Sequence, residues 1–151
     1  MEISAKGDYA MRALTVLASV GGGPMTVVEL AEAQGIPPRF LQAILLRLRQ
    51  RGLLLSHRGA DGGYRLARAP SEITVADVLR AVDGPLAAVR GVPPEEIVYS
   101  GVAEPLSEVW LALRASMRRV IEHVTLADIV DGPLPEYVRG LIAGEEAWRS
   151  G

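Results

Sequence analysis

The chain has 151 residues, a formal net charge of −2, two His and no Cys, and this length favours one domain or one compact module with an appended arm. The 49% of hydrophobic residues argues against a disordered chain, and the lack of Cys excludes disulfides, Cys nucleophiles, thiolate zinc sites and cysteine-ligated iron–sulfur clusters. No apolar stretch approaches the roughly 20 residues of a bilayer span and no signal-peptide pattern opens the chain, so we expect a cytoplasmic protein with no membrane partner.

The first predicted helix runs from Tyr9 to Val20. Gly21–Pro24 ends it, because three Gly and a Pro make continuation of a helix costly. Apolar residues recur three and four positions apart along it and predict one buried face: Ala10, Ala13, Leu14, Leu17 and Ala18.

Two further helices are predicted to form a helix-turn-helix. Thr26–Glu29 is a capping box that starts the first of them, which runs to about Gln34. Gly35 can take the left-handed conformation that closes a helix. The next helix spans 38–50 and stops at Gly52, and the short Gly-containing turn between the two is typical of this motif. Its predicted buried face holds Leu41, Ile44, Leu45 and Leu48.

A β-hairpin is predicted directly after the helix-turn-helix. Two short extended runs, 53–58 and 64–68, flank the Gly-rich loop Gly59–Gly63. A hairpin in this place is a wing. Thr74 then caps a fourth helix, which runs from Val75 to about residue 82.

The last third of the chain is predicted to contain one long helix. The apolar residues of 85–104 show no regular spacing, so this segment is predicted to be an irregular connector. From Pro105 onward apolar residues keep helical spacing over about five turns, and a short helix follows at 126–130. The tail 132–151 is expected to form a loose helix around 137–148 or to be disordered.

Basic residues concentrate in the first half of the chain. Residues 1–70 hold nine Lys and Arg against five acidic residues, whereas residues 71–151 hold seven against thirteen. This asymmetry fits a polyanionic partner such as double-stranded DNA, although ordinary surface charge explains it equally well.

The second helix of the helix-turn-helix carries candidate base-reading side chains, because this helix enters the major groove in such motifs. Arg39 has the donors to pair with guanine, and Gln42 can pair with adenine. Arg47 and Arg49 lie nearer the flanks, where phosphate contacts are commoner. Leu46, on the same side, either touches a thymine methyl or folds back into the core.

The wing carries a second candidate contact. Arg58 stands beside His57 at the entrance to the Gly-rich loop, and an Arg on a thin loop fits a narrow minor groove. The alternative is that Arg58 is a solvated strand end.

Four ordered blocks of this sequence, Lys6–Leu14, Phe40–Leu53, Ser56–Arg68 and Ile73–Gly84, resemble the Rrf-two family of bacterial winged-helix transcription regulators, of the IscR/NsrR/CymR type. The resemblance is close over about residues 1–86 and extends to the long helix by its position and character. It implies a homodimer with crossed long helices and a palindromic operator.

The resemblance also assigns site residues. The base-reading positions of the family fall on Arg39, Phe40, Gln42 and Ala43, and its minor-groove Arg falls on Arg58. The family often has Ser at the place of Arg39 and Glu-Gln at Gln42-Ala43, so the operator sequence does not carry over. The predicted DNA-binding residues are Lys6, Thr26, Pro38, Arg39, Phe40, Gln42, Ala43, Arg47, Arg49, His57, Arg58 and Gly62.

The long helix offers a dimer interface, although the same apolar stripe would also suit intramolecular core. The predicted interface residues are Leu106, Val109, Trp110, Leu113, Met117, Val120, Ile121 and Val124. The expected fold class is mainly α with a β-hairpin wing: a winged helix-turn-helix domain over 1–84, a connector or sensor lobe over 85–104, the long dimerisation helix and the short helix over 105–131, and the tail over 132–151.

Iron–sulfur members of the family carry three Cys before the long helix, whereas residues 87–104 hold none. No cofactor is therefore expected, and His57 and His123 make no metal motif. The sequence leaves open whether a small-molecule effector or a protein co-regulator acts on this protein. Arg90, Glu95, Glu96 and Tyr99 are either candidates for an effector site or plain surface residues.

The sequence thus predicts a DNA-binding transcriptional repressor that acts as a homodimer. The alternative is a winged-helix module whose main partner is another protein. An enzyme is not expected, because the sequence has no nucleophile elbow, no P-loop and no close acid/base pair with a His.

Overall fold

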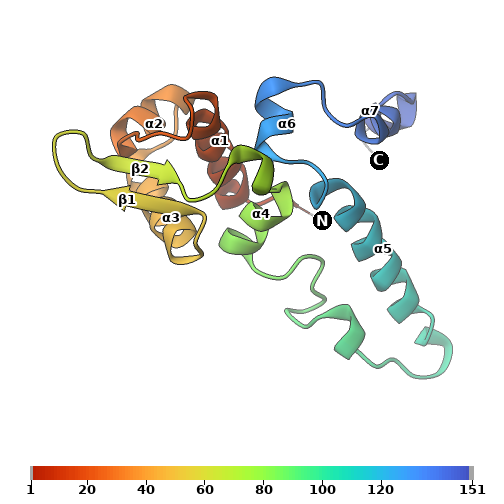
Figure 1. The fold of residues 1–151 in the computed structure, drawn as a ribbon. Helices are drawn as coiled ribbons and strands as arrows, with labels where there is room; N and C mark the ends of the chain where they lie inside the picture. Colours follow the sequence, from red (N-terminus) through yellow and green to blue (C-terminus); the bar gives the residue numbers. More distant parts are fainter. Residues whose placement is uncertain (1, 150–151) are drawn as a thin grey trace.

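The computed structural model describes residues 2–149 and is mainly helical with one two-stranded antiparallel hairpin (Figure 1). This confirms the predicted fold class. Short 3₁₀ turns lie between several elements. The helices and strands are α1 (Ala5–Ser19), α2 (Val27–Gln34), α3 (Pro38–Gln50), β1 (Leu54–His57), β2 (Gly63–Leu66), α4 (Val75–Asp83), α5 (Leu106–Ile121), α6 (Leu126–Asp131) and α7 (Glu136–Ile142).

Helix α1 begins four residues earlier than predicted. Ser4 is its N-cap, and the Ser4 hydroxyl accepts a hydrogen bond from the Gly7 amide at 2.9 Å. The same hydroxyl donates to the Asp83 carboxylate at the end of α4, at 2.6 Å. A Cβ on Gly7 would lie 3.0 Å from Leu79, so this Gly lets α1 approach α4 closely. The periodicity of apolar residues did not predict this first turn, because its residues are mainly small or polar.

Helices α2 and α3 form the predicted helix-turn-helix. Thr26 and Glu29 make the expected capping box, and the backbone hydrogen bond from Thr26 lowers the pKa of the Glu29 carboxyl. Gly35 ends α2 in the left-handed conformation, with φ 61°. Pro38 opens α3, where the missing N–H of proline costs no helical hydrogen bond.

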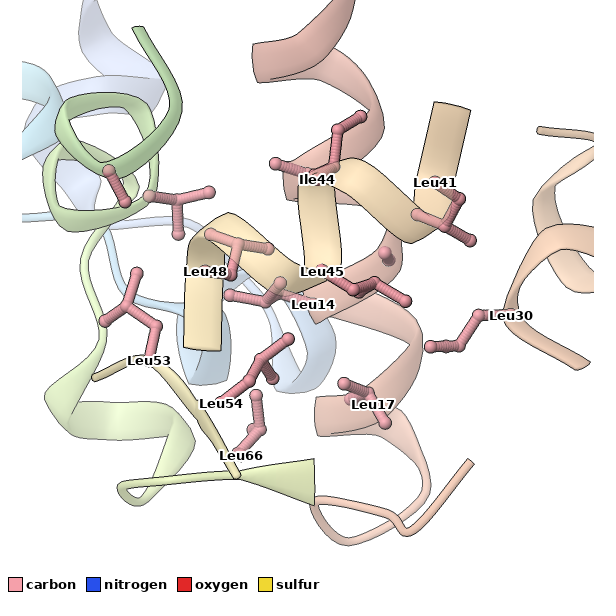
Figure 2. Close-up of a cluster of buried hydrophobic side chains, with 14 of the residues drawn as sticks. Leu14, Leu17, Leu30, Leu41, Ile44, Leu45, Leu48, Leu53, Leu54 and Leu66 are labelled. Carbon is pink, nitrogen blue, oxygen red and sulfur yellow. The ribbon is translucent and has the colours of Figure 1, made fainter. Parts of the chain in front are cut away.

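The core lies between α1, α3 and the start of the hairpin, and it is almost entirely aliphatic (Figure 2). The four α3 residues predicted to be buried are all at most 4% exposed. Figure 2 shows them converging with side chains from α1 and β1. The largest fully buried side chains of this cluster are Leu14, Leu17, Leu30, Leu41, Leu45, Leu48, Leu54, Ile73 and Leu126.

The hairpin is held in place by the segment that precedes α2. Leu54 pairs with Leu66 and His57 with Gly63 across the two strands. On its other edge β2 exchanges two backbone hydrogen bonds between Met25 and Tyr64, at 2.9 and 2.7 Å. The wing is therefore tied to the helix-turn-helix by backbone pairing as well as by core side chains.

Helix α5 differs from the others because none of its 16 residues is buried within the chain. It stands beside the rest of the fold, reached through the irregular connector that follows α4 (Figure 1). Trp110 donates its indole N–H to the Tyr99 hydroxyl of the connector at 2.9 Å.

None of the helices within residues 2–149 has the length and apolarity to cross a membrane.

Two features after α5 differ from the prediction. Val124 is only 6% exposed, and its carbonyl accepts from the Val75 amide at 2.9 Å, so it belongs to the core of its own chain rather than to the exposed stripe on α5. Helix α6 packs on α1, with Leu126 fully buried. The short helix grouped with the long one by sequence is therefore part of the N-terminal body.

The tail contains α7 and a short 3₁₀ turn, Glu145–Trp148. The Tyr137 hydroxyl donates to the Arg119 carbonyl and so joins α7 to α5. Val138 is 9% exposed, whereas Trp148 is 76% exposed. Of the two alternatives for the tail, a loose helix is the one observed.

Gly63→Ala is expected to destabilise the fold through a direct clash. A Cβ at this position would lie 2.4 Å from the Met25 carbonyl oxygen, and φ is +137°. Gly59→Ala is the matched control, because Gly59 also has a positive φ, +112°, but open space around it. We expect urea denaturation to show an additional loss of about 1–3 kcal/mol for Gly63→Ala. Equal losses in the two variants would contradict this account.

Candidate nucleic-acid interface

The face of α3 opposite the core is exposed over its whole length. Arg39, Gln42 and Ala43 project from the first two turns of this face, and Phe40 among them is 62% exposed. Leu46 is 41% exposed, so it stays on the surface rather than folding back into the core. The first two turns of the helix therefore present two polar side chains, Arg39 and Gln42, beside apolar ones.

Four residues predicted to contact DNA line one surface cavity of about 270 Å³, where α1, α3 and α4 meet. Lys6 lies at its α1 side, and its Nζ is 3.7 Å from an Asp83 carboxylate oxygen. The other three, Phe40, Ala43 and Arg47, come from α3. This hollow places a cation beside the exposed aromatic ring at the start of α3.

Arg47 and Arg49 each donate one side-chain hydrogen bond within residues 2–149. Arg47 donates its Nε–H to the Ala81 carbonyl of α4 at 2.9 Å. Arg49 donates from Nη1 to the Ser56 hydroxyl of β1 at 3.0 Å. Each guanidinium has further N–H donors, so both side chains hold α3 in place while keeping a charge at its flank.

The wing loop is the second exposed element. His57 and Arg58 are both exposed at its entrance. Gly62 shapes the loop, because a Cβ there would lie 2.7 Å from the Gly59 carbonyl oxygen. Thr26 caps α2, and its hydroxyl donates to the Glu29 carboxylate at 2.9 Å.

Several other basic residues are used inside the fold. Arg12 donates to the Gln34 side chain at 3.2 Å, and it also lies over the Tyr9 ring. Arg68 lies 3.6 Å from Asp77. Within residues 2–149, Arg39, Arg51 and Arg58 have no acidic group within 4.0 Å. Arg51 lies at the C-cap of α3, just after the last residue of the helix.

The geometry defines a class of protein. A helix-turn-helix with an exposed, partly basic second helix, followed by a Gly-rich hairpin that carries an Arg, is a winged helix-turn-helix of the DNA-binding type.

Comparison with known proteins identifies the family. Residues 3–132 match the family model Rrf2, described as an iron-dependent transcriptional regulator. A helix-turn-helix transcriptional regulator of Mycobacterium tuberculosis is 53% identical over 142 residues, which cover 93% of this chain and 88% of the relative. CymR of Bacillus subtilis is 32% identical, over 91% of this chain and 98% of CymR.

Solved structures of CymR and IscR regulators have the same fold as this chain. The structure of B. subtilis CymR superposes with a TM-score of 0.73 at 32% identity, covering 87% of this chain and 97% of CymR. IscR from T. potens superposes with a TM-score of 0.71 at 29% identity, covering 99% and 97%. The chain belongs to the Rrf2 family and is a transcriptional regulator with a DNA-binding fold, not an enzyme.

The iron named in the family description does not fit this chain. The sequence has no Cys, the usual ligand of iron–sulfur clusters. No three His, Asp or Glu side chains come together as a metal-binding group in the part of the chain that the structure describes. The connector before α5 therefore lacks the Cys ligands of an iron–sulfur cluster.

Arg47→Ala is expected to lower the free energy of unfolding by about 1 kcal/mol, because it removes the hydrogen bond that joins α3 to α4. Arg51→Ala is the control. Arg51 lies at the end of the same helix, with no side-chain hydrogen bond or ion pair within residues 2–149, and is expected to change stability by less than about 0.5 kcal/mol. Urea denaturation measures both; equal effects would show that the Arg47 contact contributes nothing.

Proposed function

We propose that this regulator is a homodimeric repressor that binds a palindromic operator, with α3 in the major groove and the wing in the minor groove. The observation that carries the proposal is the exposed face at the start of α3, which holds Arg39 and Gln42 side by side with open access. In helix-turn-helix proteins the N-terminal residues of this helix contact base edges.

The two polar side chains suit different bases. The Arg39 guanidinium can donate two hydrogen bonds to the N7 and O6 of a guanine, and the Gln42 amide can pair with the N6 and N7 of an adenine. Phe40 and Leu46 offer apolar contact to thymine methyl groups from the same face. Arg58 on the wing loop has the charge and reach for a narrow minor groove.

The dimer is supported by the exposure of α5. Leu106, Val109 and Leu113 are 39%, 52% and 38% exposed on one side of this helix. The other predicted interface residues on α5, Trp110, Met117, Val120 and Ile121, are half-buried. A helix with no residue buried in its own chain gains most of its stability from packing against a partner.

The experiment that tests the DNA-binding proposal is selection of bound fragments from the source genome by the purified, metal-free protein at fixed near-physiological salt. Enrichment of a palindrome with half-sites about one helical turn apart supports it. Salt-insensitive or absent binding to DNA, with a protein recovered as the partner instead, would favour the protein-interaction alternative.

Arg39→Ala is expected to lose preference at one base position per half-site, by about 1–3 kcal/mol, because one bidentate contact to a base is removed. Arg51→Ala, at the other end of α3, serves as the comparison and is expected to keep the base preference. Binding to operator variants by fluorescence anisotropy measures the effect. A uniform loss across all sequences would instead assign Arg39 to a phosphate.

Leu113→Glu is expected to shift the protein from dimer to monomer, because it places a charge in the centre of the apolar stripe on α5. Leu111→Glu is the matched control, since Leu111 has the same residue type and a similar exposure, 37%, but lies outside the stripe. Analytical ultracentrifugation distinguishes the two species. A wild-type monomer, or equal dissociation by both variants, would overturn the interface.

A further inference from the structure

A second cavity lies away from the DNA-binding face, between α4, the connector and α5, with a volume of about 230 Å³. Its lining has an unusual composition for a surface hollow. Three guanidinium groups and one carboxylate face it, from Arg80, Arg114, Arg118 and Glu95, and Pro85 and Pro93 form part of an apolar wall.

The three guanidinium groups are held in place by two carboxylates. Arg114 pairs with Glu95 of the connector. Arg80 of α4 and Arg118 of α5 both donate to the same oxygen of Glu122, from Arg118 at 2.8 Å. The cluster therefore has three positive charges against two negative ones, and it joins three segments that are distant in the sequence.

The acidic partners are ionised at neutral pH. The Glu95 amide and the Arg114 guanidinium lower the pKa of the Glu95 carboxyl, and hydrogen bonds from Arg80 and Arg118 lower the pKa of the Glu122 carboxyl. Glu122 is shared between two Arg, whereas Glu95 has one. The Glu95 side chain is also 53% exposed, and it sits on a single 3₁₀ turn, Pro94–Glu96. It is thus the more easily displaced counterion.

The connector segment between Pro85 and Pro93, the two prolines that line this cavity, contains unusual backbone. Arg90 and Ala87 have φ values of 53° and 54°, a region that non-glycine residues rarely adopt. Paired backbone hydrogen bonds between Val89 and Val92, at 2.9 and 3.0 Å, close the turn between the two proline walls. Strain of this kind persists where the surrounding structure maintains it, often at ligand sites.

We propose that this cavity binds a small organic anion, whose carboxylate or phosphate group takes the place of the Glu95 carboxylate against Arg114, with Arg118 lining the same cavity. Guanidinium groups bind both oxyanions through paired N–H donors. The apolar wall suits the carbon skeleton of such a molecule. In the free protein Glu95 occupies the position of the ligand oxyanion, so the site is already organised for one.

The test uses the full chain without DNA, so its result does not depend on the proposed function. Isothermal titration calorimetry measures binding of inorganic phosphate and of succinate in chloride buffer at constant ionic strength. The comparison shows which oxyanion the cavity binds. Saturable binding of phosphate alone identifies a phosphoryl ligand, and saturable binding of succinate identifies a carboxylic acid. Either result supports the site, and absence of saturable binding by both overturns it.

Three variants locate the binding. Arg114→Gln is expected to weaken it about tenfold, through loss of a charged hydrogen bond. Glu95→Gln is expected to tighten it, because the internal competitor loses its charge. Arg119→Gln is the control, since Arg119 is on α5 but lines other hollows. Unchanged or weaker binding in Glu95→Gln, or equal losses in Arg114→Gln and Arg119→Gln, would overturn the proposal.

Discussion

Burial of one side of α3 is the constraint on which the rest of the structure depends. Leu41, Leu45 and Leu48 lie against α1 and the hairpin with no exposed surface. Because the side chains of a helix point in fixed directions around its axis, burying this side forces Arg39 and Gln42 outward. The buried leucines therefore determine which side of α3, the side proposed to read bases, faces outward.

Helix α4 lies between the proposed DNA-binding face and the proposed anion site. On one side the Ala81 carbonyl accepts from Arg47 of α3, and Asp83 accepts from Ser4 at the start of α1. On the other side Arg80 reaches the cavity beside α5 and pairs with Glu122. Neighbouring residues on one short helix thus contact both the helix-turn-helix and the arginine cluster.

Local signals in the sequence predicted the helix-turn-helix well. A capping box at Thr26, a Gly at 35 and a Pro at 38 mark helix ends by chemistry that acts within a few residues, and α2 and α3 begin and end where these signals indicate. The start of α1 was missed because Ser4 acts as a cap in a polar stretch that has no apolar period.

Local sequence signals did not predict the tertiary contacts. The burial of Val124 and the packing of α6 on α1 depend on partners about fifty or more residues away. Of the candidate site, helical periodicity placed Arg39, Gln42 and Ala43 on the exposed side of α3, whereas the wing was located from its Gly-rich loop and Phe40 from the family resemblance. The contacts that occupy Arg47, Arg49 and Lys6 could not, because they join different elements.

The return of the chain after α5 has a mechanical consequence. Helix α4 leads into the connector before α5, and the backbone of Thr125 pairs with Thr74 at the start of α4 just after α5 ends. The C-terminal end of α5 is therefore tied closely to the N-terminal body, whereas its N-terminal end reaches the same body only through the long connector. Any displacement of α5 would pivot about its C-terminal end and would have to bend the connector.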